Sequence, residues 1–496
     1  MADSSYRVFG YARRGMLFIV ALLLLGVTLF GAYQLSIYHR NMAVSDANLP
    51  SLPALSHKDR ILILSPHPDD ETLGAGGLMA KATSMGVPVR VIFLTNGDGS
   101  LATRLVQDAQ FVEQMAKGKA PKRPRNIYRQ IAPMRQKESL AALAKLKVPK
   151  KNATFLGYPD GGTKQMWETN WNPDHPFRSP YTKADHSPYA NSWTPNAPYC
   201  GQQALKDVEQ IIAGFKPTIV ITTNPYDTHP DHWAAYSYLS AAIAQLQLQQ
   251  KNVSWAGKIK CYTFIVHHGF WPAPHGYHPN TELSPPADLM DVGASWLQLL
   301  LNKNDEKAKA DALRQYKSQL ATTPQFLRGF LRRNELFAQQ KTISHSEAVA
   351  SWKEIIKGPK NDLLLPQLIP GGDITSIFLK RQGKVLTLRI NLARKPWSGI
   401  NYIVSVHLVN SDAIYCNKIN VTANNKQQWQ AIIVSLGQKS VAANTRLKTD
   451  ADNNKIEIRL PLSSLAPKSD ANNIFLISAT SVFRKRVLDQ TPTQIV

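Results

Sequence analysis

Cysteine is scarce in this sequence, and its scarcity removes several classes of site. The 496 residues include three cysteines, Cys200, Cys261 and Cys416, and no two of them form a Cys-x-x-Cys pair. The usual cysteine-based zinc and redox motifs are therefore excluded. An odd number leaves at least one thiol unpaired, and nothing in the spacing requires a disulfide. Cysteine usage thus says little about the compartment of the protein.

Acidic residues are also few relative to basic ones. The chain has 35 Asp and Glu against 58 Lys and Arg, which gives a net charge of +23. Such an excess fits a nucleic acid, an anionic membrane surface or an acidic polymer as partner. No zinc-finger spacing, aromatic RNP run or basic heptad repeat accompanies it. We therefore expect a basic surface that faces acidic lipids or glycans, and no nucleic-acid partner.

Long apolar runs are missing from the chain, with one exception near the amino terminus. Met16–Leu35 contains no charged residue, and about 20 apolar residues suffice to cross a bilayer as a helix. The run is longer than the apolar region of a usual signal peptide and lacks a small-x-small cleavage site. We therefore expect a single uncleaved membrane anchor over residues 16–36.

Three arginines decide the expected orientation of that anchor. Arg7, Arg13 and Arg14 precede the apolar run, and the positive-inside rule places such residues in the cytoplasm. We therefore expect a cytoplasmic tail over residues 1–15. The remainder of a single-pass chain, with its catalytic domain, is then expected on the extracytoplasmic side.

Beyond a linker at residues 37–57, strand-like and helical patterns alternate. Apolar runs of strand length occur at Ile61–Leu64, Val89–Leu94, Thr154–Leu156, Thr218–Thr222 and Cys261–Val266. Helical spacing occurs at Thr72–Met85, Met134–Leu146, Gln203–Phe215, His232–Leu248 and Lys303–Phe337. This alternation predicts an α/β domain over residues 58–345, with a Rossmann-like, mainly parallel sheet and helices on both faces. In such sheets the site lies beyond the carboxyl ends of the strands.

The carboxyl-terminal part has a different sequence pattern. After a predicted linker at residues 346–368, short β-rich runs joined by Asn, Gly, Ser and Lys follow one another. This pattern predicts a β-rich, sandwich-like domain over residues 369–496. The sequence shows no internal repeat and no low-complexity block.

One stretch interrupts the α/β pattern. Residues 167–199 are rich in Pro, Asn, Trp, Tyr and His, and a long loop in a compact domain is usually functional or disordered. Aromatic rings pack against the C–H faces of sugars. We therefore expect this loop to shape a substrate cleft with its aromatic side chains, Trp167, Trp171, Tyr181, Tyr189, Trp193 and Tyr199.

The first chemically informative motif follows the first apolar strand. Residues 61–77 read ILILSPHPDDETLGAGG, which places His67, Asp69 and Asp70 at the mouth of the sheet. A catalytic zinc takes three nitrogen or oxygen ligands and keeps one position open. His67 and Asp70 are close enough to share a metal, and Asp69 is then the candidate for taking a proton from its water. The alternative is an Asx-turn that caps a helix.

A second motif repeats this placement. Residues 219–235 read IVITTNPYDTHPDHWAA, again a strand followed by a helix. His232 is a candidate third metal ligand, and Asp231 a candidate partner that orients an imidazole. His229, as an imidazolium, is a candidate for stabilising a tetrahedral intermediate. Surface histidines at a helix start are the alternative for this motif alone, but they explain two such motifs poorly.

The two motifs resemble the PIG-L/LmbE-like family of zinc-dependent N-deacetylases. Further matches occur in the family's order, and with the two motifs they cover about residues 58–340: Thr95–Asp98, Arg135 with Glu138, Leu156–Gly161, Tyr316–Gln319, Phe326 and Glu335. The membrane run, the aromatic loop and the β-rich tail are departures from the family pattern. The resemblance therefore bears least on the substrate.

The resemblance implies a Rossmann-like fold and hydrolysis of the N-acetyl group of an N-acetylglucosamine-type sugar. It implies His67, Asp70 and His232 as ligands of Zn²⁺ or Fe²⁺. It also implies Asp69 as general base and His229 as electrostatic catalyst.

Further polar residues of these segments are candidate substrate contacts: Glu71, Asp98, Arg135, Asp160 and His268. His268 follows the last apolar strand of the α/β pattern, so its side chain is expected near the cleft. Its alternative is a hydrogen-bonded histidine at a strand end. His175 lies in the aromatic loop with no strand before it, and we do not expect it to bind the catalytic metal.

The substrate expected from these features is an N-acetylated amino-sugar glycan or glycolipid that is envelope-bound or lipid-linked. Two alternatives stay open. The chain is a catalytically inert, membrane-anchored glycan-binding or scaffold protein, or the same zinc site hydrolyses another bond, such as an ester. Metal analysis separates the first alternative from an enzyme, and product analysis separates the second.

Overall fold

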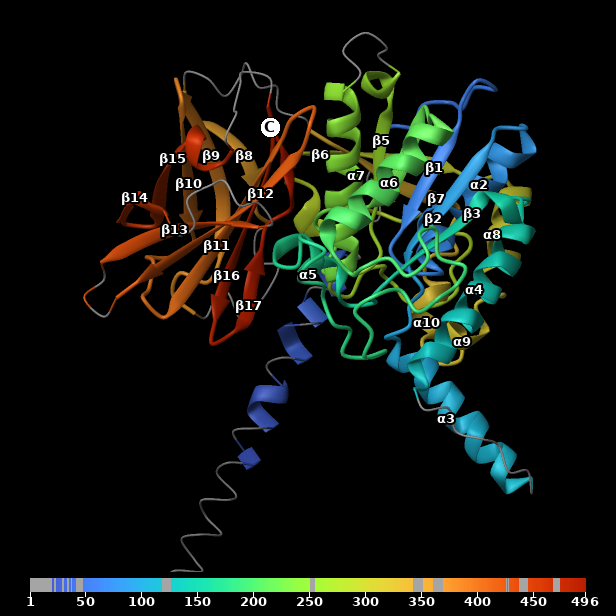
Figure 1. Ribbon diagram of the computed structural model, residues 1–496. Coiled ribbons are helices and arrows are strands. Elements are labelled where there is room, and N and C mark those ends of the chain that lie inside the picture. The colour runs from blue at the N-terminus through green and yellow to red at the C-terminus, as the bar shows by residue number, and fades with distance from the viewer. Residues whose placement is uncertain are drawn as a thin grey trace, which may run out of the picture.

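The structure is a computed structural model in which two sheet-based units lie side by side (Figure 1). It describes residues 20–21, 24–28, 31–33, 35–36, 38–41, 48–117, 126–249, 255–341, 351–359, 369–424, 426, 428–436, 445–466 and 473–496.

The first unit is built on a seven-stranded sheet in the order β3-β2-β1-β4-β5-β7-β6. Neighbours from β3 to β5 are parallel, whereas β5–β7 and β7–β6 are antiparallel. The mainly parallel sheet expected from the sequence is thus confirmed. Its strands are β1 (Ile61–Ser65), β2 (Val89–Thr95), β3 (Ala153–Tyr158), β4 (Ile219–Thr223), β5 (Lys260–Phe264), β6 (Ala294–Leu300) and β7 (Asn334–Gln340).

Helices cover both faces of this sheet because its central strands are apolar on both sides. Ile61 and Ile63 of β1 belong to one apolar core, and the alternating Leu62 and Leu64 belong to the other. Successive residues of a strand point to opposite faces, so a continuous apolar run requires cover on each. One core includes α2 (Asp70–Ser84), α4 (Tyr128–Lys145) and α8 (Lys303–Leu313), and the other α6 (Gly201–Phe215) and α7 (Pro230–Gln249).

The helical pattern expected over Lys303–Phe337 is only partly correct. It divides into α8 and two short helices, and its last residues belong to β7. The residues of β7 pair with β6 along its whole length, and this pairing overrides the helical spacing. The remaining helices of this unit are α3 (Leu101–Ala116), α5 (Thr163–Glu168), α9 (Lys317–Leu320) and α10 (Pro324–Arg328).

The second unit is an eleven-stranded sheet whose described pairings are all antiparallel. Inward residues of β9 and β10 share one apolar core with those of β11 and β12, as a sandwich requires. The strands are β8 (Lys353–Lys357), β9 (Ile374–Gln382), β10 (Val385–Leu392), β11 (Ile400–Val409), β12 (Ile414–Ala423), β13 (Trp429–Leu436), β14 (Thr445–Asp452), β15 (Lys455–Pro461), β16 (Ile474–Phe483), β17 (Arg486–Gln490) and β18 (Gln494–Ile495). β8 lies in the segment expected to be a linker, so part of that segment belongs to this sheet.

The two units are packed against each other through α7. Val409, Cys416 and Leu476 of the second sheet belong to the same apolar core as the inner face of α7. Trp233 of α7 donates its indole N–H to the carbonyl of Thr491 at 3.0 Å. The carboxyl-terminal strands therefore support the helix that follows the second motif.

Cys200, Cys261 and Cys416 are all free thiols.

The expected membrane anchor falls largely on residues outside the described part of the chain. Within residues 16–36, short pieces such as 24–28 are described, and they are helical. Among the described residues, the structure contains no helix with the length and apolar character needed to span a bilayer.

Candidate metal and catalytic site

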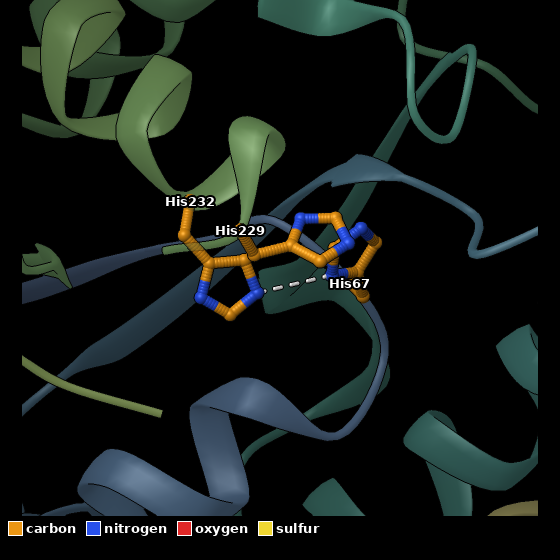
Figure 2. Close-up of side chains that lie close together, drawn as sticks. All are labelled: His67, His229 and His232. Atoms are coloured by element: carbon orange, nitrogen blue, oxygen red, sulfur yellow. Dashed lines mark hydrogen bonds between the residues drawn. The ribbon is translucent and has the colours of Figure 1, made fainter. Parts of the chain in front are cut away.

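The two motifs meet because their strands are neighbours in the sheet. β1 and β4 are paired in parallel, so the loops after them leave the same edge. His67 follows β1, and His229 and His232 stand at the start of α7 after β4. Figure 2 shows the three imidazoles gathered at this point. Residues separated by more than 160 positions thus form one cluster.

Three ligand atoms converge within this cluster. Nδ1 of His67 lies 3.1 Å from Oδ2 of Asp70, and Nε2 of His232 lies 3.1 Å from the same oxygen. The two ring nitrogens are 3.2 Å apart. Zinc binds imidazole nitrogen and carboxylate oxygen at about 2.0–2.2 Å. Ligand atoms at these separations can therefore share one ion, and the set is the one expected from the sequence.

The charges around these atoms also fit a cation. The carboxylates of Asp70, Asp227 and Asp231 are buried beside the two rings. Burial lowers the pKa of His232, but Asp227 and Asp70 outweigh it and raise that pKa to about 9. Burial also lowers the pKa of His67, but neighbouring carboxylates such as Asp160 outweigh it, so the pKa of His67 is raised. The buried carboxylates favour positive charge at the cluster, which a divalent ion would supply.

Other combinations of side chains offer donor atoms within 4.8 Å of one another. They are His67 with His229 and His232, Asp70 with His232 and His267, and His67 with Asp160 and Asp231. Each combination shares at least one residue with the close set of His67, Asp70 and His232. We favour that set because its three atoms are mutually 3.1–3.2 Å apart.

A buried carboxylate orients each of the two imidazoles. Nδ1 of His232 lies 3.0 Å from Oδ2 of Asp227, and Nε2 of His67 lies 3.1 Å from Oδ2 of Asp231. A ring that donates from one nitrogen presents the other nitrogen as a ligand. The structure thus places Asp231 against His67, an orienting position of the kind expected from the sequence.

Asp227 was missed by the sequence reasoning. Besides His232, its carboxylate accepts the backbone N–H groups of His229, Val266 and His267 at 2.9–3.0 Å. Burial alone would raise the pKa of Asp227, but these bonds and the charge of His232 hold it well below its usual range. The available signal was a carboxylate two positions before His229, in the loop already singled out.

Asp69 occupies a strained backbone position beside the ligands. Its φ of 129° and ψ of −32° lie in a region that residues with a side chain rarely adopt. Arg135 holds it there by pairing with its carboxylate at 3.2 Å and by donating to the carbonyl of Pro68 at 2.5 Å. Strain of this kind persists where the surroundings enforce it, often at functional sites.

The loop after β2 makes room for Arg135. Gly97 has a φ of 63°, and a Cβ at this position would clash with the guanidinium of Arg135. Arg135 also donates to the Gly97 carbonyl at 3.3 Å. It is 4% exposed. Its placement therefore favours positioning of Asp69 over the substrate contact expected from the sequence.

The pKa of the Asp69 carboxyl is raised to about 8. Burial is the largest cause, the charge of Arg135 opposes it, and the charges of Asp70 and Glu71 add to it. A carboxyl with a pKa near neutrality can both accept and return a proton, which is what a general acid–base group requires.

Glu71, another expected substrate contact, is fully buried beneath Asp69. It accepts the hydroxyls of Thr72 and Tyr316 and the backbone N–H of Asp69. Burial raises its pKa despite these bonds. Its contacts are with the protein, so we assign it to the support of the Asp69 backbone.

His229 lies beside the ligand set. Its ring centroid is 4.7 Å from that of His67 and 5.0 Å from that of His232. Burial lowers its pKa to about 4, with the charges of His67 and His232 contributing. Nδ1 of His229 accepts the N–H of Asp231 at 3.2 Å. The structure thus favours a neutral ring with an Nε2–H donor, rather than the imidazolium expected from the sequence.

The histidine pair after β5 is divided between two environments. His268 is 7% exposed, and its Nε2 is hydrogen-bonded to the carboxylate of Asp288 at 2.8 Å. This is the hydrogen-bonded histidine at a strand end that the sequence left open as the alternative. His267 faces the cluster instead, 4.9 Å from His232 between ring centroids, and stacks on Phe326. Neighbouring residues of an extended chain point in opposite directions, and the sequence alone did not fix which one faces inward.

Asp98 and Asp160 form the side of the site next to β2 and β3. Oδ1 of Asp160 lies 3.3 Å from Nε2 of His67. Asp98 accepts the hydroxyl of Tyr189 at 2.5 Å and the N–H of Asp160 at 3.3 Å. Burial and the neighbouring Asp160 charge raise the pKa of Asp98 to about 7. Asp160 thus contacts a ligand ring, whereas Asp98 supports the loop.

The aromatic loop does not present the sugar-binding faces expected of it. Trp167, Trp171 and Tyr199 are at most 5% exposed and belong to the core beneath α6 and α7. Tyr189 is bonded to Asp98, and Trp193, which is 41% exposed, lies under the guanidinium of Arg90. Tyr181 is the member that reaches the rim, next to Gly99. The four buried rings, Trp167, Trp171, Tyr189 and Tyr199, stabilise the domain, so most of the loop's aromatic residues lose their role as evidence for a glycan.

Comparison with known proteins finds a family match over this region. Residues 62–243 match the family model described as PIG-L: GlcNAc-PI de-N-acetylase, and they form a PIG-L domain. They include all the motif residues of the ligand set.

Two curated relatives and one solved structure illustrate the similarity. A 1D-myo-inositol 2-acetamido-2-deoxy-alpha-D-glucopyranoside deacetylase of Mycobacterium sp. (strain KMS) is 29% identical over 201 residues, 40% of this chain and 54% of the relative. The deacetylase of the same name from Gordonia bronchialis is 26% identical over 42% of this chain and 63% of the relative. A conserved protein from Thermus thermophilus is 17% identical over 58% of this chain and 96% of its own, with a TM-score of 0.34. The chain spans about half the length of the curated relatives it matches.

Proposed function

We propose that the PIG-L domain of this chain hydrolyses the N-acetyl group of an N-acetylglucosamine-type sugar and releases acetate. The observation that carries the proposal is the convergence of His67, Asp70 and His232, at 3.1–3.2 Å, beside a strained Asp69. The relatives named above are deacetylases of an acetamido sugar, which supports the same reaction class here.

His67, Asp70 and His232 would hold the metal, for which we propose zinc. A bound divalent ion supplies a water of lowered pKa and polarises the acetyl carbonyl. The chain's own contribution begins with Asp227 and Asp231, which fix the two ligand rings through bonds of 3.0 and 3.1 Å. An inert scaffold has no need of such buried carboxylates, because each costs free energy unless it is paired.

Asp69 carries the proton in this scheme. Its carboxylate takes a proton from the attacking water as the new C–O bond forms at the acetyl carbonyl. The protonated carboxyl then returns that proton to the sugar nitrogen as the C–N bond breaks, which yields acetate and a free amine. Arg135, 3.2 Å away, favours the ionised form of Asp69 and keeps it in place.

His229 is placed to stabilise the developing charge. Because Nδ1 accepts the Asp231 amide at 3.2 Å, the neutral ring carries its proton on Nε2. That N–H can donate to the carbonyl oxygen as it becomes negative. The donor is fixed before the reaction, so little reorganisation is needed.

The test is acetate release by the full chain from a panel of N-acetylated and O-acetylated sugars. We expect release from N-acetylglucosamine-type sugars, loss of release on chelation, and recovery with Zn²⁺ or Fe²⁺. His67→Ala should lose both the metal, by elemental analysis, and the activity. Full metal occupancy in His67→Ala would refute the ligand assignment, and preferential release from O-acetyl sugars would refute the amide.

We further propose that the substrate is attached to the cell envelope or to lipid and that the catalytic domain is extracytoplasmic. The uncharged run at residues 16–35, the arginines before it and the net charge of +23 support this placement. Protease added to spheroplasts should digest the carboxyl-terminal unit. Complete protection of that unit would reverse the orientation.

A further inference from the structure

Helix α3 carries an apolar face that the rest of the domain does not cover. Four of its large apolar side chains are more than half exposed: Leu101 63%, Leu105 56%, Val112 64% and Met115 57%. Their spacing of four, seven and three residues places them on one side of the helix. Asp108, paired with Arg104, lies on the same side between Leu105 and Val112, so the face is apolar apart from this ion pair. Exposed apolar surface of this kind marks an interaction site.

The attachment of α3 leaves this face free. Near its start, Thr103 is fully buried and accepts the side-chain amide of Gln319 at 2.5 Å. Arg104 donates to the hydroxyl of Tyr128 at 2.6 Å. Beyond these contacts the helix extends away from the body of the α/β unit, as Figure 1 shows. The outer turns of α3 are therefore held by the hydrogen bonds of the helix itself, and their side chains are exposed.

The charges on α3 and in the sequence after it favour an anionic partner. Within the helix, Arg104 pairs with Asp108 at 3.5 Å, and Lys117, just past its end, pairs with Glu113 at 2.5 Å. In the sequence, residues 117–125 contain five Lys and Arg and no acidic residue. An apolar helix face with an excess of basic charge is typical of proteins that bind the surface of an anionic bilayer.

The position of α3 agrees with a membrane on that side. In Figure 1 the described pieces of the amino-terminal segment, within residues 20–41, and α3 both lie on the lower side of the α/β unit. The described residues of that segment include exposed apolar side chains, with Leu24 at 62% and Val27 at 70%. One bilayer can therefore meet both elements.

α3 also begins at the rim of the candidate site. Ser100 accepts the N–H of Thr103 at 3.2 Å and so caps the helix. The preceding Gly99 donates to Asp160 at 2.9 Å, and Asp160 contacts His67. A membrane that holds α3 is thus adjacent to the edge of the sheet where the ligand set lies.

We propose that the apolar face of α3 inserts into the interface of an anionic bilayer and brings the candidate site to membrane-attached substrates. The substrate part rests on the proposed function: it specifies an N-acetylated amino sugar carried by a lipid. The docking part does not depend on activity. Two measurements therefore test them separately.

Spin labels measure the docking directly. The full chain, with its exposed Cys261 changed to Ser, is reconstituted into phosphatidylcholine vesicles with or without phosphatidylglycerol. Labels at Leu105→Cys and Val112→Cys should be accessible to oxygen and shielded from a water-soluble nickel complex. A label at Gln114→Cys, on the opposite side of the helix, should show the reverse. Omitting phosphatidylglycerol should reduce the difference.

Two results would overturn the docking. Equal exposure of all three labels to the nickel complex would show that α3 stays in water. Dipolar broadening between labels at Val112→Cys would show that a second copy of the chain covers this face instead of lipid.

Kinetics test the substrate part. The double variant Leu105→Glu/Val112→Glu should raise KM for an N-acetylglucosamine glycolipid in vesicles by about tenfold relative to a soluble N-acetylated sugar. Gln114→Glu adds charge on the other side and should leave that ratio unchanged. An unchanged ratio in the double variant would overturn membrane delivery of the substrate. Absence of acetate release from both substrates in the parent chain would instead overturn the proposed function, while the spin labels still decide the docking.

Discussion

The two sheets of this chain place their polar residues in opposite ways. In the first sheet, five parallel strands end at one edge, and the loops after them bring His67, Asp160 and His232 together. In the second, neighbouring strands are antiparallel, so successive loops alternate between two edges. The parallel sheet brings residues that are far apart in the sequence to one end of the sheet, whereas the antiparallel sheet puts successive loops at opposite ends.

The buried polar groups differ accordingly. Asn417 in the second sheet donates to the carbonyl of Leu465 at 3.0 Å, and Ser481 donates to that of Gly372 at 2.5 Å. These bonds join backbone segments of the sandwich. Buried Asp227 and Asp231 in the first unit instead bind side chains of the ligand set. We therefore expect substitutions in the first unit to affect turnover and those in the second to affect stability.

The largest expected effect is on turnover, at Asp69. Asp69→Asn removes the group proposed to carry the proton, and the loss of a general base costs about 10²–10⁴-fold in kcat. The metal content should stay at the parent level, because Asp69 is not in the ligand set. Acetate release and elemental analysis measure the two quantities. Asp174→Asn, at an exposed loop position, is the matched control, and near-normal turnover of Asp69→Asn would assign the proton transfer to another group.

The reciprocal effect is expected in the sandwich. Leu388 of β10 is fully buried in its core, and a Leu→Ala change at such a site costs about 2–5 kcal/mol of unfolding free energy. Leu388→Ala should therefore unfold at lower denaturant concentration, while kcat at 25 °C stays at the parent value. A proportional fall in kcat in the folded variant would show that the second sheet takes part in the reaction.

The sequence predicted that His67, Asp70 and His232 lie together because two strong signals agreed: an apolar strand before each motif and a parallel pattern that joins the strand ends. It did not predict that His267, rather than His268, faces the cluster, because a shift of one residue along the chain decides which ring points inward. It misjudged the aromatic loop because composition cannot tell a ring that lines a cleft from one that fills a core, as Trp171 and Tyr199 do. It missed β7, whose pairing with β6 is set by tertiary contact.

A smaller effect separates orientation of a ligand from ligation. Asp227→Asn keeps an oxygen for the backbone N–H groups but places an amide against Nδ1 of His232, 3.0 Å away. Removing such a partner typically costs 10–100-fold in metal affinity. Competition with a zinc chelator measures that affinity. Asp288→Asn, which disturbs His268 instead, should leave it unchanged, and an equal loss in both variants would mean that the effect is not specific to His232.

The smallest expected effect concerns stability and pH, at a carboxyl of the first unit remote from the site. Burial raises the pKa of Glu209 on α6 to about 7, and its Oε1 is buried without a hydrogen-bond partner among the described residues. An unfolded Glu has a pKa near 4.3. Below about pH 4 the group is protonated in both states and has no effect. As pH rises towards 7 the unfolded state ionises first, so the folded state loses stability, and above about pH 7 the loss is constant.

Glu209→Gln should remove this loss. We expect it to stabilise the protein by roughly 1–2 kcal/mol at pH 8, because an amide carries no charge to desolvate and one pKa unit is worth about 1.4 kcal/mol, reduced here by the partial exposure of the side chain, and to have little effect at pH 4. Urea unfolding at the two pH values measures the difference, and Glu282→Gln, at an exposed position, is the control. kcat should not change, because Glu209 contacts no member of the ligand set. A gain in stability that is equal at both pH values would show that packing, rather than ionisation of Glu209, is responsible.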